Sequence, residues 1–503
     1  MSQRIPVLVG VGQHVVRDPD LGSLPTPVSL AVAACKAALA DCGGSGVAEV
    51  IDTLAVVRLN SDSVASRSGP FGVYGNLPRL VAAQIGANPA TAILSVVGGQ
   101  SPQQLVNEMS NKVAAGTSEV VLLTGAEAIG AMKTALRAGE KLAWDDVAEG
   151  QLEDRGMGPQ LIVPDEIAGG MGFPPQVYGA FEHAWRGKQG MTQVQHMAHM
   201  ASLFAPFSKI ASENPYAQFP VERSEEFLST SAKDNYPIAD PYLKWHVAQD
   251  AVNQGAALLL THEERARELG IPQEQWVYLH GGADTQDKLV SRRSALHESA
   301  AMAAATSAAL DASSSSVSDI DHLELYSCFP CAVQYACDAL GIDSRDRQLT
   351  QTGGLPFFGG AGNNYSMHGI ASMVETLRAD PGSRGLVLAN GGFLSKESVG
   401  IYSTARPDAY TPVDNTAAQQ AIDTVPDVEQ ATAPTRGNIE AYSVLYDRGV
   451  PLFAYAFMRD GAKRFLARTN TKDTAAAERL LVGDPLGQEF AVEVSPKRIT
   501  LVT

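Results

Sequence analysis

The chain has 503 residues, of which 45 % are hydrophobic and 18 % are charged. This length predicts about three domains, and the composition allows a large core. The 38 basic and 55 acidic residues give a net charge of −17, which argues against nucleic acid and anionic membrane surfaces as partners.

Other features of the composition indicate a cytoplasmic protein. No apolar run approaches the ~18 residues that are needed to cross a bilayer. The first nine residues lack the basic and apolar regions of a signal peptide. The chain has five cysteines, a small and odd number that fits a reducing compartment better than a disulfide framework.

Strands alternate with helices in the first part of the chain. Apolar runs at 5–9, 50–59 and 92–97 predict strands, and residues 29–39 and 77–85 predict helices. This alternation predicts an α/β core with a parallel sheet.

A glycine-rich loop, Gly98-Gly99, follows the third of these strands. Ser101 is a good N-cap residue, and Pro102 suits the first helical position. A helix comes next, and the apolar run 120–124 predicts another strand. The order is therefore strand, loop, helix and strand.

The alternation stops after residue 130 and resumes later. Residues 131–242 hold proline-containing loops and two predicted helices, at 178–186 and 194–204. The run 255–261 predicts the next sheet strand. We predict that 131–242 is an inserted loop domain on one rim of the sheet.

Residues 349–393 repeat the earlier plan. Gly359-Gly360 correspond to Gly98-Gly99, an amphipathic helix is predicted at 365–378, and 385–389 predicts a buried strand. We interpret this as an internal duplication. Two such units facing each other would place two glycine-rich loops and two helix N-termini around one crevice.

The C-terminal part has a different pattern. Residues 407–438 have the composition of a linker, rich in Ala, Thr, Asp and Pro. Alternating runs beginning at Ile439 predict several short strands. We predict that 439–503 is a small all-β domain, a five-stranded barrel of the OB type.

Three separated motifs resemble the thiolase superfamily over residues 5–405. In chain order they are LELYSCFP, TGGLPFFGGAGNNYSMHG and VLANGGF. The segment QGMTQVQHMAHMASLFAPFSKIASENPYAQF resembles the loop domain of the sterol-carrier-protein-type thiolases. With the extra C-terminal domain, the whole chain resembles the type 1 thiolase-like proteins.

The resemblance implies a duplicated five-layered α-β-α-β-α fold with a loop domain between its halves. The N-terminal half would comprise residues 1–130 and 243–285, and the C-terminal half residues 286–406. Thiolases are homodimers, and the resemblance places the dimer contact at the edge strand near 92–97. If the extra barrel covered that edge, the protein would be a monomer.

The positions that carry catalysis in thiolases are all changed here. The resemblance places the nucleophilic cysteine at Gly98, the oxyanion-hole residue at Tyr326, the Gly-His-Pro histidine at Gly360 and the acid/base cysteine at Ala389. Glycine and alanine can neither attack a thioester nor transfer a proton. Loss of the nucleophile alone costs on the order of 10⁶ in kcat in one hydrolase. We expect a member of the acetyl-CoA acetyltransferase superfamily, in lipid metabolism, with little or no thiolase turnover.

The resemblance also implies coenzyme A or an acyl-CoA as a ligand, and no covalently bound cofactor. Backbone N–H groups at the two loops would contact a thioester oxygen or a phosphate. The residues that we expect to provide this contact are Gly99, Ser101, Gly359 and Gly391.

Two alternative functions stay open at this point. Tyr326, Tyr365 and His368 are candidate catalytic residues, because a phenol can act as acid or base if its pKa is lowered. Thiolase-like aldolases use tyrosines in this region, so the chain could be a retro-aldol carbon–carbon lyase on an acyl-CoA. Alternatively, both tyrosines simply fill space, as aromatic residues usually do, and the protein is a non-catalytic scaffold whose barrel contacts a protein partner.

We predict no metal site. Cys328-Phe-Pro-Cys331 is formally a CxxC motif, but no second pair supports zinc. His196 and His199 lie three residues apart on a predicted helix, without a visible third ligand. We interpret all four as packing residues.

Overall fold

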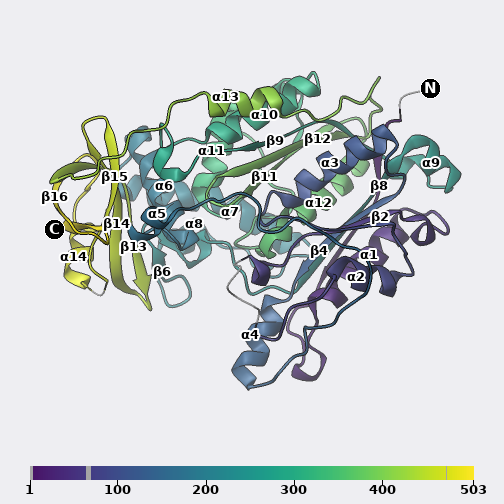
Figure 1. Ribbon diagram of the computed structural model, residues 1–503, viewed down its shortest axis with the longest axis horizontal. Coiled ribbons are helices and arrows are strands. Elements are labelled where there is room, and N and C mark those ends of the chain that lie inside the picture. Colours follow the sequence, from purple (N-terminus) through teal and green to yellow (C-terminus); the bar gives the residue numbers. More distant parts are fainter. Residues whose placement is uncertain (1–3, 64–69, 472) are drawn as a thin grey trace.

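The computed structural model describes residues 4–63, 70–471 and 473–503. Ten strands form a hydrogen-bonded sheet in the order β10-β11-β12-β9-β1-β8-β4-β2-β3-β5 (Figure 1). They are β1 (Pro6–Val15), β2 (Thr53–Val56), β3 (Thr91–Leu94), β4 (Val121–Glu127), β5 (Glu153–Asp154), β8 (Gln254–His262), β9 (Val277–Gln286), β10 (His322–Leu325), β11 (Arg384–Gly391) and β12 (Lys396–Ser403).

The sheet consists of two leaves with the same topology. In the first leaf β1 pairs antiparallel with β8, β8 antiparallel with β4, and β4 parallel with β2. In the second leaf β9, β12, β11 and β10 are joined in the same order and directions. The leaves meet at β1 and β9 through two residue pairs. The duplication predicted from the sequence is confirmed.

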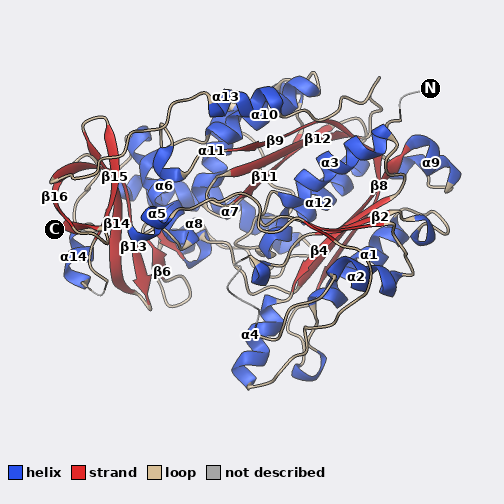
Figure 2. Cartoon of the chain, in the orientation of Figure 1, coloured by secondary structure: helices blue, strands red, loops and turns tan. Residues whose placement is uncertain are grey.

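Helices α3 (Ser101–Ala115) and α12 (Tyr365–Ala379) lie between the two leaves (Figure 2). Their apolar faces share one core cluster with strands of both leaves. Helices α1 (Pro27–Asp41) and α2 (Leu77–Ile85) cover the outside of the first leaf, and α10 (Ala300–Ala312) and α11 (Pro330–Leu340) that of the second. These are the five layers that the family resemblance implied.

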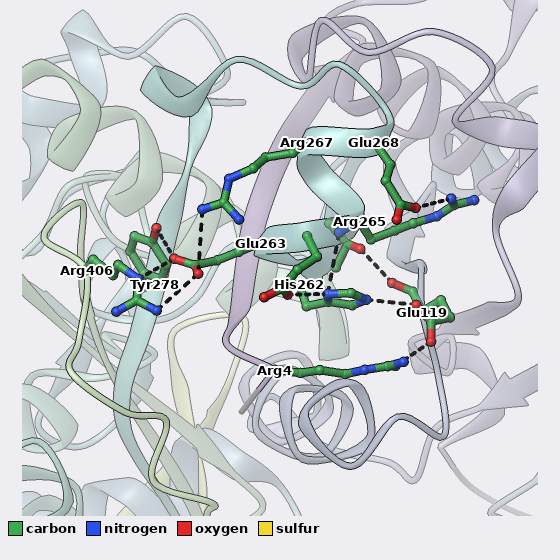
Figure 3. A network of polar contacts seen from close by, with 11 residues as sticks. Arg4, Glu119, His262, Glu263, Arg265, Arg267, Glu268, Tyr278 and Arg406 are labelled. Atoms are coloured by element: carbon green, nitrogen blue, oxygen red, sulfur yellow. Dashed lines mark hydrogen bonds and ion pairs between the residues drawn. The ribbon is translucent and has the colours of Figure 1, made fainter. Parts of the chain in front are cut away.

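The two leaves are also joined by polar contacts near the point where β1 and β9 meet (Figure 3). The carboxylate of Glu263, at the start of α9 (Glu263–Glu268), is buried. It accepts hydrogen bonds from the Tyr278 hydroxyl (2.9 Å) on β9 and from Arg406 Nε (2.7 Å) beyond β12. Beside it, His262 contacts Glu119 at 2.8 Å. Arg406 of the second leaf is therefore paired with Glu263 of the first leaf, whereas the contact between His262 and Glu119 lies within the first leaf.

The segment between β4 and β8 contains five α-helices among long loops. It contains α4 (Ile129–Ala138), α5 (Pro164–Ala168), α6 (Pro174–Gln189), α7 (Gln193–Glu213) and α8 (Glu225–Ser229), with the short strands β6 (Pro237–Ala239) and β7 (Tyr242–Leu243). The two long helices extend beyond the predicted 178–186 and 194–204. Reciprocal hydrogen bonds between Thr192 and Gln195 form a capping box at the start of α7.

The C-terminal strands form a closed barrel. They are β13 (Arg436–Asp447), β14 (Val450–Asp460), β15 (Lys463–Arg468), β16 (Glu489–Val494) and β17 (Ile499–Val502), with α14 (Thr474–Arg479) between β15 and β16. Pairing in the order β13-β14-β15-β17-β16-β13 closes the ring. This confirms the predicted five-stranded barrel, which lies beside α6 at one end of the molecule (Figure 1).

The barrel is attached to the core in two ways. Strand β6 pairs with β13, and Arg186 of α6 makes two hydrogen bonds of 2.7 Å to the Asp484 carboxylate. The segment predicted as a linker contains a helix, α13 (Thr416–Asp423), in which Gln419 binds the backbone of Gln286. Among the described residues, no helix is long and apolar enough to span a bilayer.

The edge of β3 is covered by β5, not by the barrel. Ile93 and Leu94 pair in parallel with Glu153 and Asp154, and Arg155 N donates to Leu94 O at 3.1 Å. The Arg155 guanidinium also pairs with Glu108 on α3, at 2.5 and 2.8 Å. The edge that the resemblance assigned to a dimer contact is thus hydrogen-bonded within the chain.

This pairing predicts a monomer whose self-association can be induced. Arg155→Pro removes the N–H that binds Leu94 O, so the edge of β3 loses a partner and becomes available to a second chain. We expect the wild-type protein to elute at the 53.1 kDa of one chain and Arg155→Pro to form dimers or larger species, as measured by light scattering after size exclusion. Arg155→Ala, which keeps the N–H, should stay monomeric. A monomeric Arg155→Pro protein would contradict this explanation.

Candidate functional site

The two glycine-rich loops meet between the leaves, as the duplication predicted. Gly98 N donates to Asn363 Oδ1 at 3.1 Å, and Ser366 Oγ donates to Gly99 O at 2.7 Å. The N-termini of α3 and α12 lie at this contact. Ser101 is the first residue of α3 and not, as predicted, its N-cap. Its hydroxyl donates to Val96 O at 2.9 Å.

Other side chains surround Gly98, the position that the resemblance assigns to the thiolase nucleophile. Gly98 has φ 135°, and a Cβ atom on it would overlap Gln100 Oε1 and lie 2.8 Å from Lys396 Nζ. A Cβ atom on Gly391 would also overlap Gln100 Oε1. The Gln100 side chain therefore occupies the space between the first glycine-rich loop and the end of β11. Its Oε1 is buried and has no hydrogen-bond partner among the described residues.

Lys396 is the second residue that fills this space. It is the first residue of β12, is 5 % exposed, and donates from Nζ to Val97 O. Burial lowers the pKa of its ammonium to about 8. Sequence analysis missed Lys396 and Gln100. The available signal was a lysine at the first position of the segment KESVGIYS, which contains the apolar residues Val399, Ile401 and Tyr402.

Tyr326 lies directly against the first glycine-rich loop. Its hydroxyl occupies the place of a Cβ atom on Gly99, and its ring contacts the edge of Tyr365, with 5.5 Å between the centroids. No hydrogen bond to the hydroxyl occurs among the described residues. Burial, with the nearby Cys328 and Glu397, raises the pKa of Tyr326 well above 10. The phenol is therefore a hydrogen-bond donor at neutral pH and not a base.

The other two candidate catalytic residues make polar contacts elsewhere. The Tyr365 hydroxyl binds Glu324 Oε1 at 2.8 Å and Thr352 Oγ1 at 2.6 Å, and burial beside Glu324 raises its pKa well above 10. His368 Nδ1 contacts Gln13 Oε1 at 2.9 Å, and burial lowers its pKa to about 3. His368 is therefore neutral at physiological pH.

Gly360 and Ala389, the other positions that the resemblance assigned to thiolase catalysis, are also buried. Gly360 N donates to Gln249 O at 2.8 Å, and Ala389 is fully buried in β11. Gly359 has φ 121°, and a Cβ atom there would lie 2.6 Å from Gln254 Oε1. Of the predicted backbone donors, the N–H of Ser101 is already bound to Gly98 O at 3.0 Å.

The cysteine and histidine pairs have packing roles. Burial raises the pKa of Cys328 to about 12 and that of Cys331 above its usual value, so neither is a reactive thiolate. His196 Nε2 contacts Glu182 at 2.8 Å, whereas His199 stacks on a tryptophan ring. No group of three metal-binding side chains occurs in the described part of the chain.

A ligand-sized cavity lies beside the 391–395 turn. Its volume is about 500 Å³, and it is lined largely by polar side chains of the second leaf, the loop at 160–161 and helix α13. Ser395 lines it, next to Lys396. Leu161 lines it as well and packs against Gly392. The cavity therefore opens next to the turn that follows β11.

The fold and the glycine-rich loops define a protein of the thiolase superfamily. Over 100 % of this chain and 99 % of that protein, the structure of a monomeric SCP2-thiolase-like protein type 1 from Mycobacterium smegmatis is 40 % identical, with a TM-score of 0.85. The chain belongs to this family of type 1 SCP2-thiolase-like proteins.

More distant structures share the thiolase fold. An acetyl-CoA acetyltransferase from Syntrophomonas wolfei is 16 % identical over 80 % of this chain and 100 % of that protein, with a TM-score of 0.57. The Ltp2-ChsH2(DUF35) aldolase is 20 % identical over 79 % and 97 %, with a TM-score of 0.58. No protein-family model and no curated protein sequence matches the chain.

A cysteine at residue 98 fits only if the ends of the Gln100 and Lys396 side chains move away. In Gly98→Cys the new side chain would displace these buried ends, at a backbone conformation that favours glycine. We expect a loss of stability of roughly 2–6 kcal/mol and no thiolysis of acetoacetyl-CoA. Denaturant unfolding and a thiolase assay measure the two effects.

Gly46 provides a matched control. It also has a positive φ, 65°, but a Cβ atom there meets no other atom within 4 Å. Gly46→Cys should therefore cost only the backbone strain, about 1–3 kcal/mol. Equal stability of the two variants, or thiolase turnover by Gly98→Cys, would show that Gln100 and Lys396 do not close the site.

Proposed function

We propose that the protein binds coenzyme A or an acyl-CoA and does not act as a thiolase. The observation that supports this proposal is that Gly98, which the resemblance assigns to the nucleophile, has the side chains of Gln100 and Lys396 against it. Without a thiol at this point, no acyl-enzyme can form by the thiolase route. The shared fold of an acetyl-CoA acetyltransferase supports a CoA ligand.

The cavity beside the 391–395 turn is the proposed ligand site. Its volume of about 500 Å³ is within the ~300–1,000 Å³ typical of small-molecule sites. Gln160, Gln286 and Gln419 line its wall with polar groups. Lys288 lies among the acidic residues Asp287 and Asp423 and is ion-paired with Asp427 at 2.9 Å. The pairing of β5 with β3 and the monomer described for the similar protein from Mycobacterium smegmatis support a monomeric protein. The five cysteines are free, which supports a location in the reducing cytoplasm.

Calorimetric titration with CoA and with acetoacetyl-CoA tests the proposal. We expect saturable binding with a Kd on the order of micromolar, about −8 kcal/mol, and no cleavage of acetoacetyl-CoA. Gln160→Trp fills the mouth of the cavity and should weaken binding at least tenfold. Gln420→Trp, an exposed residue of α13 outside the cavity, should bind like wild type. Absence of binding at millimolar ligand would refute the proposal.

A carbon–carbon lyase is the second candidate. It is favoured by the Tyr326 hydroxyl, which lies on Gly99 without a hydrogen-bond partner, and by the Lys396 amine at the neighbouring Gly98. A similar fold occurs in an aldolase. The neutral amine of Lys396 would take the proton of a β-hydroxyl, and the Cα–Cβ bond would break to give a carbonyl compound and a thioester enolate. The Lys396 ammonium would then return the proton to Cα of the enolate. Tyr326 would donate a hydrogen bond to the thioester oxygen.

β-Hydroxyacyl-CoA thioesters provide the test of lyase activity, with release of the aldehyde or ketone as the readout. Tyr326→Phe removes only the hydroxyl, and Lys396→Met only the amine. We expect each variant to lower kcat at least a hundredfold, with CoA binding retained. Full activity in Tyr326→Phe would exclude the assigned role of the phenol.

A further inference from the structure

The cavity beside the 391–395 turn is too small for the whole of coenzyme A. One benzene molecule occupies an apolar cavity of ~150 Å³, which is ~25 Å³ for each non-hydrogen atom. At that density the volume of about 500 Å³ encloses about 20 such atoms. Pantetheine, the uncharged diamide arm that ends in the thiol of coenzyme A, has nearly this number. Coenzyme A as a whole has more than twice as many.

The charges around the cavity do not suit the phosphate groups of coenzyme A. Asp287 and Asp423 lie in its wall. Lys288 is the sole cation among the described residues that line it, and its ammonium already binds Asp427 at 2.9 Å and Val425 O. Phosphates would therefore meet carboxylates of the same sign without a free cation, which is unfavourable. The net charge of −17 adds to this repulsion.

The wall offers neutral hydrogen-bonding groups and apolar surface instead. Gln286 lines the cavity and is half-buried, and its side-chain amide has no partner among the described residues. Gln160 donates from Nε2 to Ile162 O at 2.9 Å, so its Oε1 stays available as an acceptor. A side-chain amide can pair with both the N–H and the C=O of an amide in a ligand. Leu161 and Leu289 supply apolar surface for the carbon atoms between the amides.

Gln286 also connects the cavity to the centre at Gly98. It is the residue of β9 that pairs with Lys396 of β12. Side chains directly opposite each other in antiparallel strands lie on the same face, with Cβ atoms about 5 Å apart. Lys396 in turn donates to Val97 O, next to Gly98. A ligand that contacts Gln286 therefore lies one side chain away from the first glycine-rich loop.

We infer that this cavity recognises the pantetheine arm of coenzyme A and leaves the nucleotide, with its phosphates, in the solvent. Gln286 binds an amide of the arm, and Leu161 and Leu289 contact its carbon chain. The inference rests on the proposed function and specifies the part of the ligand that the protein binds. Its consequence is that coenzyme A binds no more tightly than pantetheine does.

Three ligands separate the two ends of coenzyme A. In calorimetric titrations of the full chain, pantetheine should have a Kd within about threefold of that of coenzyme A, and adenosine 3′,5′-bisphosphate should not bind at millimolar concentration. Binding of coenzyme A without binding of pantetheine would overturn this inference and leave the proposed function standing. Binding of pantetheine alone would refute the proposed function, with the arm recognised on another carrier. Absence of both would refute both.

The salt dependence of binding is a test that needs no variant. Salt screens the attraction between a phosphate and a protein cation. Because the inference places no phosphate on the protein, the Kd of coenzyme A should change less than about twofold between about 50 mM and about 500 mM NaCl. A weakening of tenfold or more would show that phosphates are bound and would overturn the inference.

Gln286→Leu removes the side-chain amide and keeps nearly the same volume. Gln419 binds only the backbone N–H and C=O of residue 286, so helix α13 stays attached. The variant should weaken pantetheine and coenzyme A by the same factor, about three- to tenfold. Gln420→Leu, on α13 outside the cavity, is the matched control and should bind both like wild type. Unchanged affinity in folded Gln286→Leu, or a loss confined to coenzyme A, would contradict the contact with the arm.

Discussion

Asn363 and Asn364 fix the distance between the two halves of the core. Asn363 accepts from Gly98 N at 3.1 Å and donates to Arg58 O at 2.9 Å, and Asn364 donates to Gly125 O at 2.7 Å. A side-chain amide has its donor and acceptor at fixed positions, so these bonds set how closely the loops and the N-termini of α3 and α12 approach. The space between Gly98 and Gly391 holds the side chain of Gln100.

The region around Gln100, Asn390 and Glu397 is not an ordinary hydrophobic core. A core that merely closed after losing its function would be expected to gain apolar side chains, because an unpaired buried polar group destabilises the fold. Here Gln100 Oε1, Asn390 Oδ1 and both carboxyl oxygens of Glu397 are buried without partners among the described residues. Native proteins keep such groups chiefly where they serve function. This polar character is the physical reason to look for a ligand or a reaction at this place.

The sequence predicted the fold well because its signals are periodic. Ile370, Met373 and Leu377 repeat at helical spacing, and the glycine-rich loops before α3 and α12 have the same position in both halves. The pairing of β5 with β3 was not predictable, because Glu153 and Asp154 are exposed and form no apolar pattern. The inward positions of the Gln100 and Lys396 side chains were not predictable from the sequence either. Whether Gln100 and Lys396 turn inward depends on contacts between segments far apart in the sequence, such as that of Lys396 Nζ with Val97 O, 299 positions away.

The ion pair between Arg186 and Asp484 affects how the chain folds during its synthesis. The two residues are 298 positions apart, and Arg186 is almost completely buried in the finished protein. At ~5–20 residues per second of synthesis, Arg186 waits roughly 15–60 s for its partner. During that interval α6 also lacks β13, the strand that covers it. The inserted segment therefore lacks these contacts until β13 and Asp484 have been synthesised, and α6 completes its packing only after that point.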